Sequence, residues 1–118
     1  MDKNIYRDIL QTQIELICRF SDDLVLTFVN NAFCDFFSIP EERLIGNKIT
    51  DILQKNNLEI FYNNMYLLSI KTPRVKYRFD TKMPDGRIIQ QEWTTLAIIN
   101  ENGEIIAYQS TAREIPER

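Results

Sequence analysis

The sequence of 118 residues contains no histidine. Histidine is the commonest general base and a frequent metal ligand. Its absence excludes Ser/His and Cys/His nucleophile pairs, a histidine ligand for zinc and a histidine-ligated haem. The adjacent carboxylates Asp22–Asp23 and Glu41–Glu42 are typical of turns and helix starts, and the sequence places no base beside them. We therefore expect a protein that is not an enzyme.

Long apolar runs and a leader sequence are missing as well. No segment approaches the roughly 18 consecutive apolar residues of a membrane-spanning helix. The opening residues MDKNIYRDIL lack the basic start, apolar stretch and small-residue cleavage site of a secretory signal. We expect a cytoplasmic location and no association with a membrane.

Cysteine is scarce, and neither sign of charge dominates. Cys18 and Cys34 form no CxxC or metal-ligand spacing, so we expect both to pack as small hydrophobic side chains. The chain has 14 basic and 17 acidic residues and a net charge of −3. Because it lacks a basic stripe that would neutralise phosphates, we expect no direct binding of nucleic acid.

The length of the chain fits one domain, and its N-terminal third predicts a helix followed by a hairpin. Apolar residues at helical spacing, among them Ile5, Ile9 and Leu10, predict an amphipathic helix over residues 5–14. Two short runs rich in β-forming residues, at 16–20 and 24–29, predict strands. Turn-forming residues at 21–23 join them.

The middle third predicts a series of short helices. Asn30 or Asn31 is suited to cap a helix that carries phenylalanine side chains. Pro40 suits a first helical position before two glutamates, and Gly46 suits the end of that helix. Helical spacing of apolar residues continues at 49–53 and at 58–70.

In the last third the apolar period changes from helical to two. Alternation over residues 74–83 predicts a strand, and the stretch MPDGR predicts a turn. Further strands are expected at 87–99 and 104–112, on either side of a turn at 100–103. Two strands, then helices, then three strands predict an α+β fold, with a five-stranded antiparallel sheet and its helices on one face.

Four segments of the sequence resemble the PAS domain family of sensory modules. The segment LTFVNNAFCDFF is similar to the family's strand followed by Asn and a short aromatic-bearing helix, and EERLIGNKITDIL is similar to its eeliGk segment. The segment PDGRIIQQEWTTLAIINENGEIIAYQSTARE resembles the family's closing strands, and REIPER resembles its RDITER exit. Each match is weak alone, but four in order indicate the family.

The resemblance implies a single PAS-like sensor domain over residues 1–118. Residues 1–14 are then a flanking helix, and residues 113–118 begin a linker to an output domain. Such domains occur in sensor histidine kinases, diguanylate cyclases and transcriptional regulators, where a conformational change passes from the last strand into a helical linker. Glu114 stands where the family pattern has Asp, and Pro116 stands where it has Thr.

The resemblance does not identify a cofactor, which stays unknown. Flavin-binding light sensors of the family carry a reactive cysteine in an Asn-Cys-Arg-Phe-Leu-type motif, whereas this chain has GNKITDIL there, with no cysteine. Cysteinyl-flavin photochemistry is therefore not expected. Ligation of haem by Cys or Met stays open.

A candidate pocket follows from the alternation of side chains along the last two strands. Gln91, Trp93 and Thr95 share one face of their strand by parity, and Gln109 shares a face with Ala107 and Thr111. The resemblance places Gln109 where flavin-binding members have a pocket glutamine. If both faces point inward, a ligand would meet one aromatic wall and two amides.

Two tyrosines are further candidates for the border of this cavity. Tyr62 and Tyr66 lie four residues apart on the predicted helix 58–70. The alternative is structural: Trp93 fills the core or a dimer face, the glutamines are solvated, and the tyrosines belong to the core.

Three functions compete on these observations. The first is a sensory or relay module that forms a homodimer through its N-terminal helix and sheet. The second is a scaffold that dimerises or docks a protein and holds no ligand. The third is a small α+β enzyme, which would need acid–base chemistry by Asp or Tyr in a pocket, because the chain has no histidine.

Overall fold

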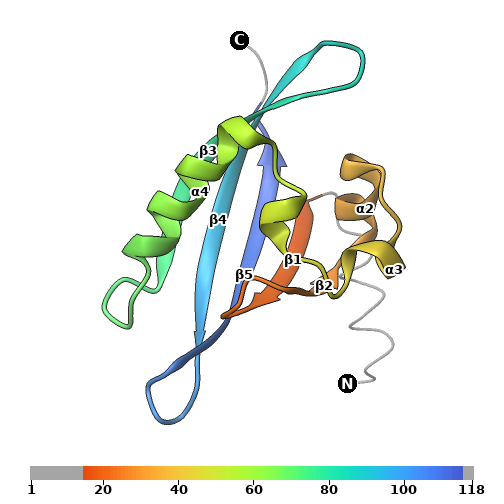
Figure 1. The fold of residues 1–118 in the computed structure, drawn as a ribbon. Coiled ribbons are helices and arrows are strands. Elements are labelled where there is room, and N and C mark those ends of the chain that lie inside the picture. The colour runs from red at the N-terminus through yellow and green to blue at the C-terminus, as the bar shows by residue number, and fades with distance from the viewer. Residues whose placement is uncertain (1–14, 116–118) are drawn as a thin grey trace.

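A computed structural model describes residues 15–115. These residues form a five-stranded antiparallel sheet with short helices against one face (Figure 1). The predicted α+β architecture is confirmed. The helix expected at residues 5–14 lies outside the described residues, as do residues 116–118 of the linker expected at 113–118. Arg113 and Glu114, at the expected start of that linker, still belong to the last strand. No helix within residues 15–115 is long and apolar enough to cross a membrane.

The strands are arranged in the order β2-β1-β5-β4-β3. Their bounds are β1 Leu16–Ser21, β2 Leu26–Val29, β3 Arg74–Lys82, β4 Ile88–Ile99 and β5 Ile105–Glu114. All five predicted strands are present. The last strand of the chain, β5, therefore lies in the middle of the sheet, with β1 on one side and β4 on the other (Figure 1).

The second strand begins at Leu26, two residues later than the sequence predicts. The turn before it is longer because the hydroxyl of Ser21 accepts hydrogen bonds from the backbone N–H groups of Asp23 and Val25, both at 3.2 Å. Leu24 then adopts a positive φ of 67°, which is incompatible with a strand.

Four short helices follow β2 in the sequence. They are α2 Asn31–Phe37, α3 Glu41–Leu44, the 3₁₀ helix η1 Ile49–Asp51 and α4 Lys55–Leu67. Asn30, not Asn31, caps α2: its Oδ1 accepts from the N–H of Phe33 at 3.0 Å. Gly46 has a φ of 91°, the left-handed conformation that glycine adopts without strain.

Helix α4 begins at Lys55, three residues before the predicted start. Its first turn is polar, so it lacks the apolar period that indicated a helix. The polar side chains there bind the edge of β3 instead. Asn57 is 1% exposed, and its Nδ2 donates to the carbonyl oxygen of Asp80 at 3.1 Å.

Aromatic rings fill the space between the sheet and the helices. Phe20, Phe61, Phe79 and Trp93 are each at most 1% exposed. The ring centroids of Phe20 and Phe61 are 6.0 Å apart, and those of Phe79 and Trp93 are 5.1 Å apart. Full burial of a large apolar side chain stabilises the fold by about 1.5–3 kcal/mol, so these rings are a main source of its stability.

Candidate functional site

Gln91 and Trp93 lie together on the inner face of β4, which faces the helices. The indole Nε1–H of Trp93 donates to the side-chain oxygen of Gln91 at 3.2 Å. The ring of Trp93 lies 5.1 Å from that of Phe79 and 6.5 Å from that of Tyr77, measured between centroids. Both predicted site residues are therefore part of a packed aromatic cluster on the inner face.

Gln109 lies on the opposite face of the sheet. It pairs with Leu96 on β4 and with Arg19 on β1, and its Oε1 accepts a hydrogen bond from Arg19 Nε at 2.7 Å. The predicted common face for Gln91, Trp93 and Gln109 is wrong. Trp93 is paired with Ala112, so the inward residues of β5 are the even-numbered ones. Parity within each strand is readable from sequence, but the register between strands is not.

Tyr62 and Tyr66 lie on the solvent side of α4. They are 50% and 90% exposed, whereas Phe61 beside them is fully buried. The structure therefore does not bring these tyrosines together with Trp93, and it does not place them in the core. The rotation of α4 about its axis is set by Phe61 and Asn57, its two buried residues.

A row of buried hydroxyl groups crosses three strands on the inner face, and the sequence did not reveal it. The hydroxyl of Tyr77 is 2.6 Å from Thr95 Oγ1, which is 2.7 Å from Ser110 Oγ. Burial raises the pKa of the Tyr77 phenol above its ordinary value. The only signal in the sequence was that Thr95 shares a strand face with Trp93. Its partners Tyr77 and Ser110 could be identified only once the pairing between the strands was known.

Cys18 lies next to this row and is fully buried. It is paired with Ser110 across β1 and β5. Burial raises the pKa of its thiol above the ordinary value, with a smaller opposing effect from a backbone hydrogen bond of Ser110. The thiol therefore stays protonated and packs as a small hydrophobic group, as the sequence predicts.

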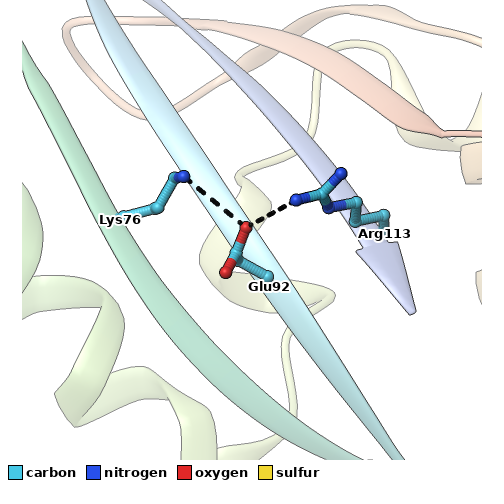
Figure 2. Close-up of polar contacts among 3 residues, drawn as sticks. All are labelled: Lys76, Glu92 and Arg113. Atoms are coloured by element: carbon cyan, nitrogen blue, oxygen red, sulfur yellow. Dashed lines mark hydrogen bonds and ion pairs between the residues drawn. The ribbon is translucent and has the colours of Figure 1, made fainter. Parts of the chain in front are cut away.

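Three charged side chains form a cluster on the outer face, next to the end of β5. Figure 2 shows Glu92 on β4 between Lys76 on β3 and Arg113 on β5. Glu92 Oε1 is 3.7 Å from Lys76 Nζ and 3.3 Å from Arg113 Nη2. A shallow groove of about 180 Å³ includes this cluster and is lined by Glu15, Arg74, Lys76, Glu92, Thr94, Thr111, Ala112 and Arg113.

Strand β5 contacts its neighbouring strands both through the backbone and through side chains on the inner face. The backbone N–H of Ile115 donates to the carbonyl oxygen of Gln90 at 2.8 Å, so pairing with β4 continues to the last described residue. On the inner face Ala112 lies opposite Trp93, and Tyr108 stacks on Phe20 at 5.4 Å. The inner side chains of β5 are therefore in contact with the rings of the core.

The family model for the PAS fold matches residues 4–115. The chain belongs to the PAS family. The expected resemblance is thereby confirmed over almost the whole sequence. PAS domains are generally sensory modules without catalytic activity. Within residues 15–115 there is no cluster of three or more His, Cys, Asp or Glu side chains that could hold a metal ion.

A curated relative of this PAS domain is the two-component sensor PprA of Pseudomonas aeruginosa. The two are 27% identical over 115 residues, which is 92% of this chain but 12% of the relative. The chain therefore spans about one eighth of that sensor's length.

Solved PAS domains have the same fold. The PAS domain of a Colwellia psychrerythraea protein is 14% identical, with a TM-score of 0.82 and 98% of each chain covered. A sensory box sensor histidine kinase from Vibrio cholerae is also 14% identical, with a TM-score of 0.73 over 98% of this chain and 93% of the other. At such low identity the likeness shows the fold alone.

Proposed function

We propose that this PAS domain is a sensory and signal-relay module of a multidomain bacterial signal-transduction protein. It detects a small ligand or a protein partner and passes a conformational change through the segment after β5 to a covalently linked output domain. The proposal includes a cytoplasmic location and a role in two-component signalling or transcription regulation. The similarity to a much longer two-component sensor supports this arrangement.

The position of β5 is the observation that carries the proposal. The strand that ends the described chain is central in the sheet, and its inner side chains contact the rings that fill the core. An edge strand is hydrogen-bonded to one neighbouring strand only. Because β5 is hydrogen-bonded to both β1 and β4, a rearrangement of the core would change the position of the segment that follows β5.

A homodimer belongs to the same proposal, built from the N-terminal segment and the outer face of the sheet. Leu96 lies on the outer face and is 39% exposed, in the row that also contains Gln109 and Arg19. Exposed apolar side chains on a sheet favour contact with a second copy.

The packed inner face supports a second candidate, a scaffold that dimerises or docks a protein without a ligand. Trp93, Phe61 and Phe79 are each at most 1% exposed and occupy the region where the sequence predicted a pocket. A ligand there would have to displace a ring. The predicted binding role of Gln91 and Trp93 therefore remains a proposal, and Gln109, Tyr62 and Tyr66 would need a separate site.

Native mass spectrometry of the freshly purified chain tests the proposal. A dimer with additional mass that is released on denaturation supports ligand sensing, and an unadorned dimer favours relay or scaffolding. Trp93→Phe should reduce retention of a core ligand, whereas Leu96→Ala on the outer face of the same strand should not. A monomer without additional mass contradicts the homodimer and a retained small ligand, and leaves only the binding of a protein partner.

A further inference from the structure

Strand β3 is an edge of the sheet, and one side of its backbone faces away from β4 (Figure 1). The N–H of Ala97 donates to the carbonyl oxygen of Pro73 at 2.7 Å, which fixes the phase of the hydrogen bonds between the two strands. Because bonding alternates along an antiparallel pair, the odd-numbered residues of β3 bond to β4. The N–H and C=O groups of the even-numbered residues therefore point away from the sheet.

The start of α4 occupies this edge at one end only. Asn57 Nδ2 donates to the carbonyl oxygen of Asp80 at 3.1 Å. Gln54 bonds to both backbone groups of Lys82. Within residues 15–115, no hydrogen bond reaches the other edge-facing backbone groups of the strand, which belong to Arg74, Lys76 and Arg78. We call residues 74–78 the open edge.

The three residues whose edge-facing backbone groups are unoccupied all carry a positive charge. Arg74, Lys76 and Arg78 are exposed, and their alternation places them on the outer face. Lys76 Nζ is 3.7 Å from Glu92, which is also bound by Arg113 (Figure 2). Arg74 and Arg78 form no ion pair with any other described residue. The open edge thus has an excess of positive charge, in a chain whose net charge is −3.

This charge pattern decides which kind of strand the open edge can accept. Two copies of the open edge, paired with each other, would place cation opposite cation, and like charges directly opposite each other are destabilising. A strand with carboxylates at alternate positions would instead place an opposite charge beside each cation, at a Cβ separation of about 4.5–5.5 Å. When a segment adds to a sheet edge, backbone hydrogen bonds supply affinity and alternate side chains supply specificity.

We propose that the open edge binds an extended acidic segment of a partner protein, which adds to the sheet as a further strand beside β3. The backbone groups of Lys76 and Arg78 bond to the segment, and the cations select carboxylates at its alternate positions. The segment ends before Lys82, because Gln54 already occupies the edge there. Edge binding does not need the proposed relay, but a role of this partner as the detected signal rests on the proposed function.

NMR titration of the 118-residue chain with the synthetic capped peptide EVEVEVE tests the proposal. We expect saturable shifts of the backbone amides of Lys76 and Arg78, with a Kd below about 1 mM. Arg78→Glu should weaken binding at least about tenfold, because an attraction becomes a repulsion. Lys82→Glu is the matched control: it reverses a charge on the same face of β3, where Gln54 occupies the backbone. It should weaken binding less than about threefold, because salt screens charges beyond the contact.

A second peptide distinguishes strand pairing from charge attraction. N-methylation of its glutamates removes the N–H donors that would face β3 and keeps every charge. The methylated peptide should bind at least about tenfold more weakly, because several hydrogen bonds are lost. Equal binding of the two peptides would reduce the contact to charge attraction and overturn the proposal.

The remaining outcomes separate the open edge from the proposed function. Absence of saturable shifts at Lys76 and Arg78 would mean that the cations only block strand pairing, which also overturns the proposal. Peptide binding by a monomer without additional mass leaves the open edge standing without ligand sensing. A dimer or a retained ligand in a chain that does not bind the peptide removes the open edge alone.

Discussion

At the scale of single residues, Asn30 organises the start of the domain. It is fully buried, and its Oδ1 accepts from the N–H groups of Ile17 and Phe33, both at 3.0 Å. Its Nδ2 donates to the carbonyl oxygen of Glu15 at 2.8 Å. One side chain thereby joins β1 to the first turn of α2. The amide has a structural role, as the capping interpretation of the sequence predicted.

Asn30→Ala should lower the free energy of unfolding by about 2–4 kcal/mol, because several buried backbone groups lose their partner at once. Asn31→Ala, one residue later and exposed, should change it by less than about 0.5 kcal/mol. Urea denaturation of the two variants measures the difference. Similar losses in both would show that Asn30 is not the capping residue.

Some residues of the candidate site could be assigned to a face of the sheet from the sequence, and others could not. The inward direction of Trp93 and Thr95 follows from alternation along one strand, and both are buried. Gln109 was misplaced because its face depends on the register between β4 and β5, which is set by pairing across the sheet. The hydrogen bond that the indole of Trp93 donates to Gln91 could not be predicted either.

At the scale of elements, the start of α4 is fastened to the edge strand β3. Gln54 immediately precedes the helix, and its Nε2 donates to the carbonyl oxygen of Lys82 at 2.8 Å. The N–H of Lys82 donates in return to Gln54 Oε1 at 2.9 Å. The side chain thus pairs with the free edge of β3 as a neighbouring strand would, and it protects that edge from other chains.

Gln54→Ala should cost about 1–2 kcal/mol of the free energy of unfolding, because two hydrogen bonds to the backbone of Lys82 are lost. Lys55→Ala, an exposed neighbour at the helix start, serves as the control and should be nearly neutral. The midpoint of urea denaturation should shift for Gln54→Ala without a change in slope. An effect no larger than that of the control would mean that the two hydrogen bonds between Gln54 and Lys82 do not stabilise the domain.

Prediction succeeded for the elements with a regular apolar period. Strands β3 and β4 were predicted to within one residue because apolar and polar side chains alternate along them. The start of α4 was missed because its polar residues make contacts with β3 that are distant in sequence. Residues 46–49 were also not predicted to line the edge of β2, where Leu26 N–H donates to Asn47 O at 2.9 Å.

At the scale of the whole molecule, the central place of β5 connects the core with the exit. Five strands could be read from local patterns, and the α+β class follows from the order of strands and helices along the chain. The strand order across the sheet could not be read from those patterns, because it is set by contacts between distant segments. The resemblance to PAS domains identified the family, and the family match confirms it.

The central claim is that a change in the buried core reaches the end of β5, and backbone hydrogen exchange at Ile115 tests it most directly. Trp93→Phe keeps an aromatic ring but removes the indole donor to Gln91, whereas Thr94→Val alters the outer face one residue away. The amide of Phe33, bonded to Asn30, reports opening of the whole domain. The account predicts faster exchange at Ile115 relative to Phe33 in Trp93→Phe only. An unchanged ratio in Trp93→Phe, or an equal change in Thr94→Val, would contradict it.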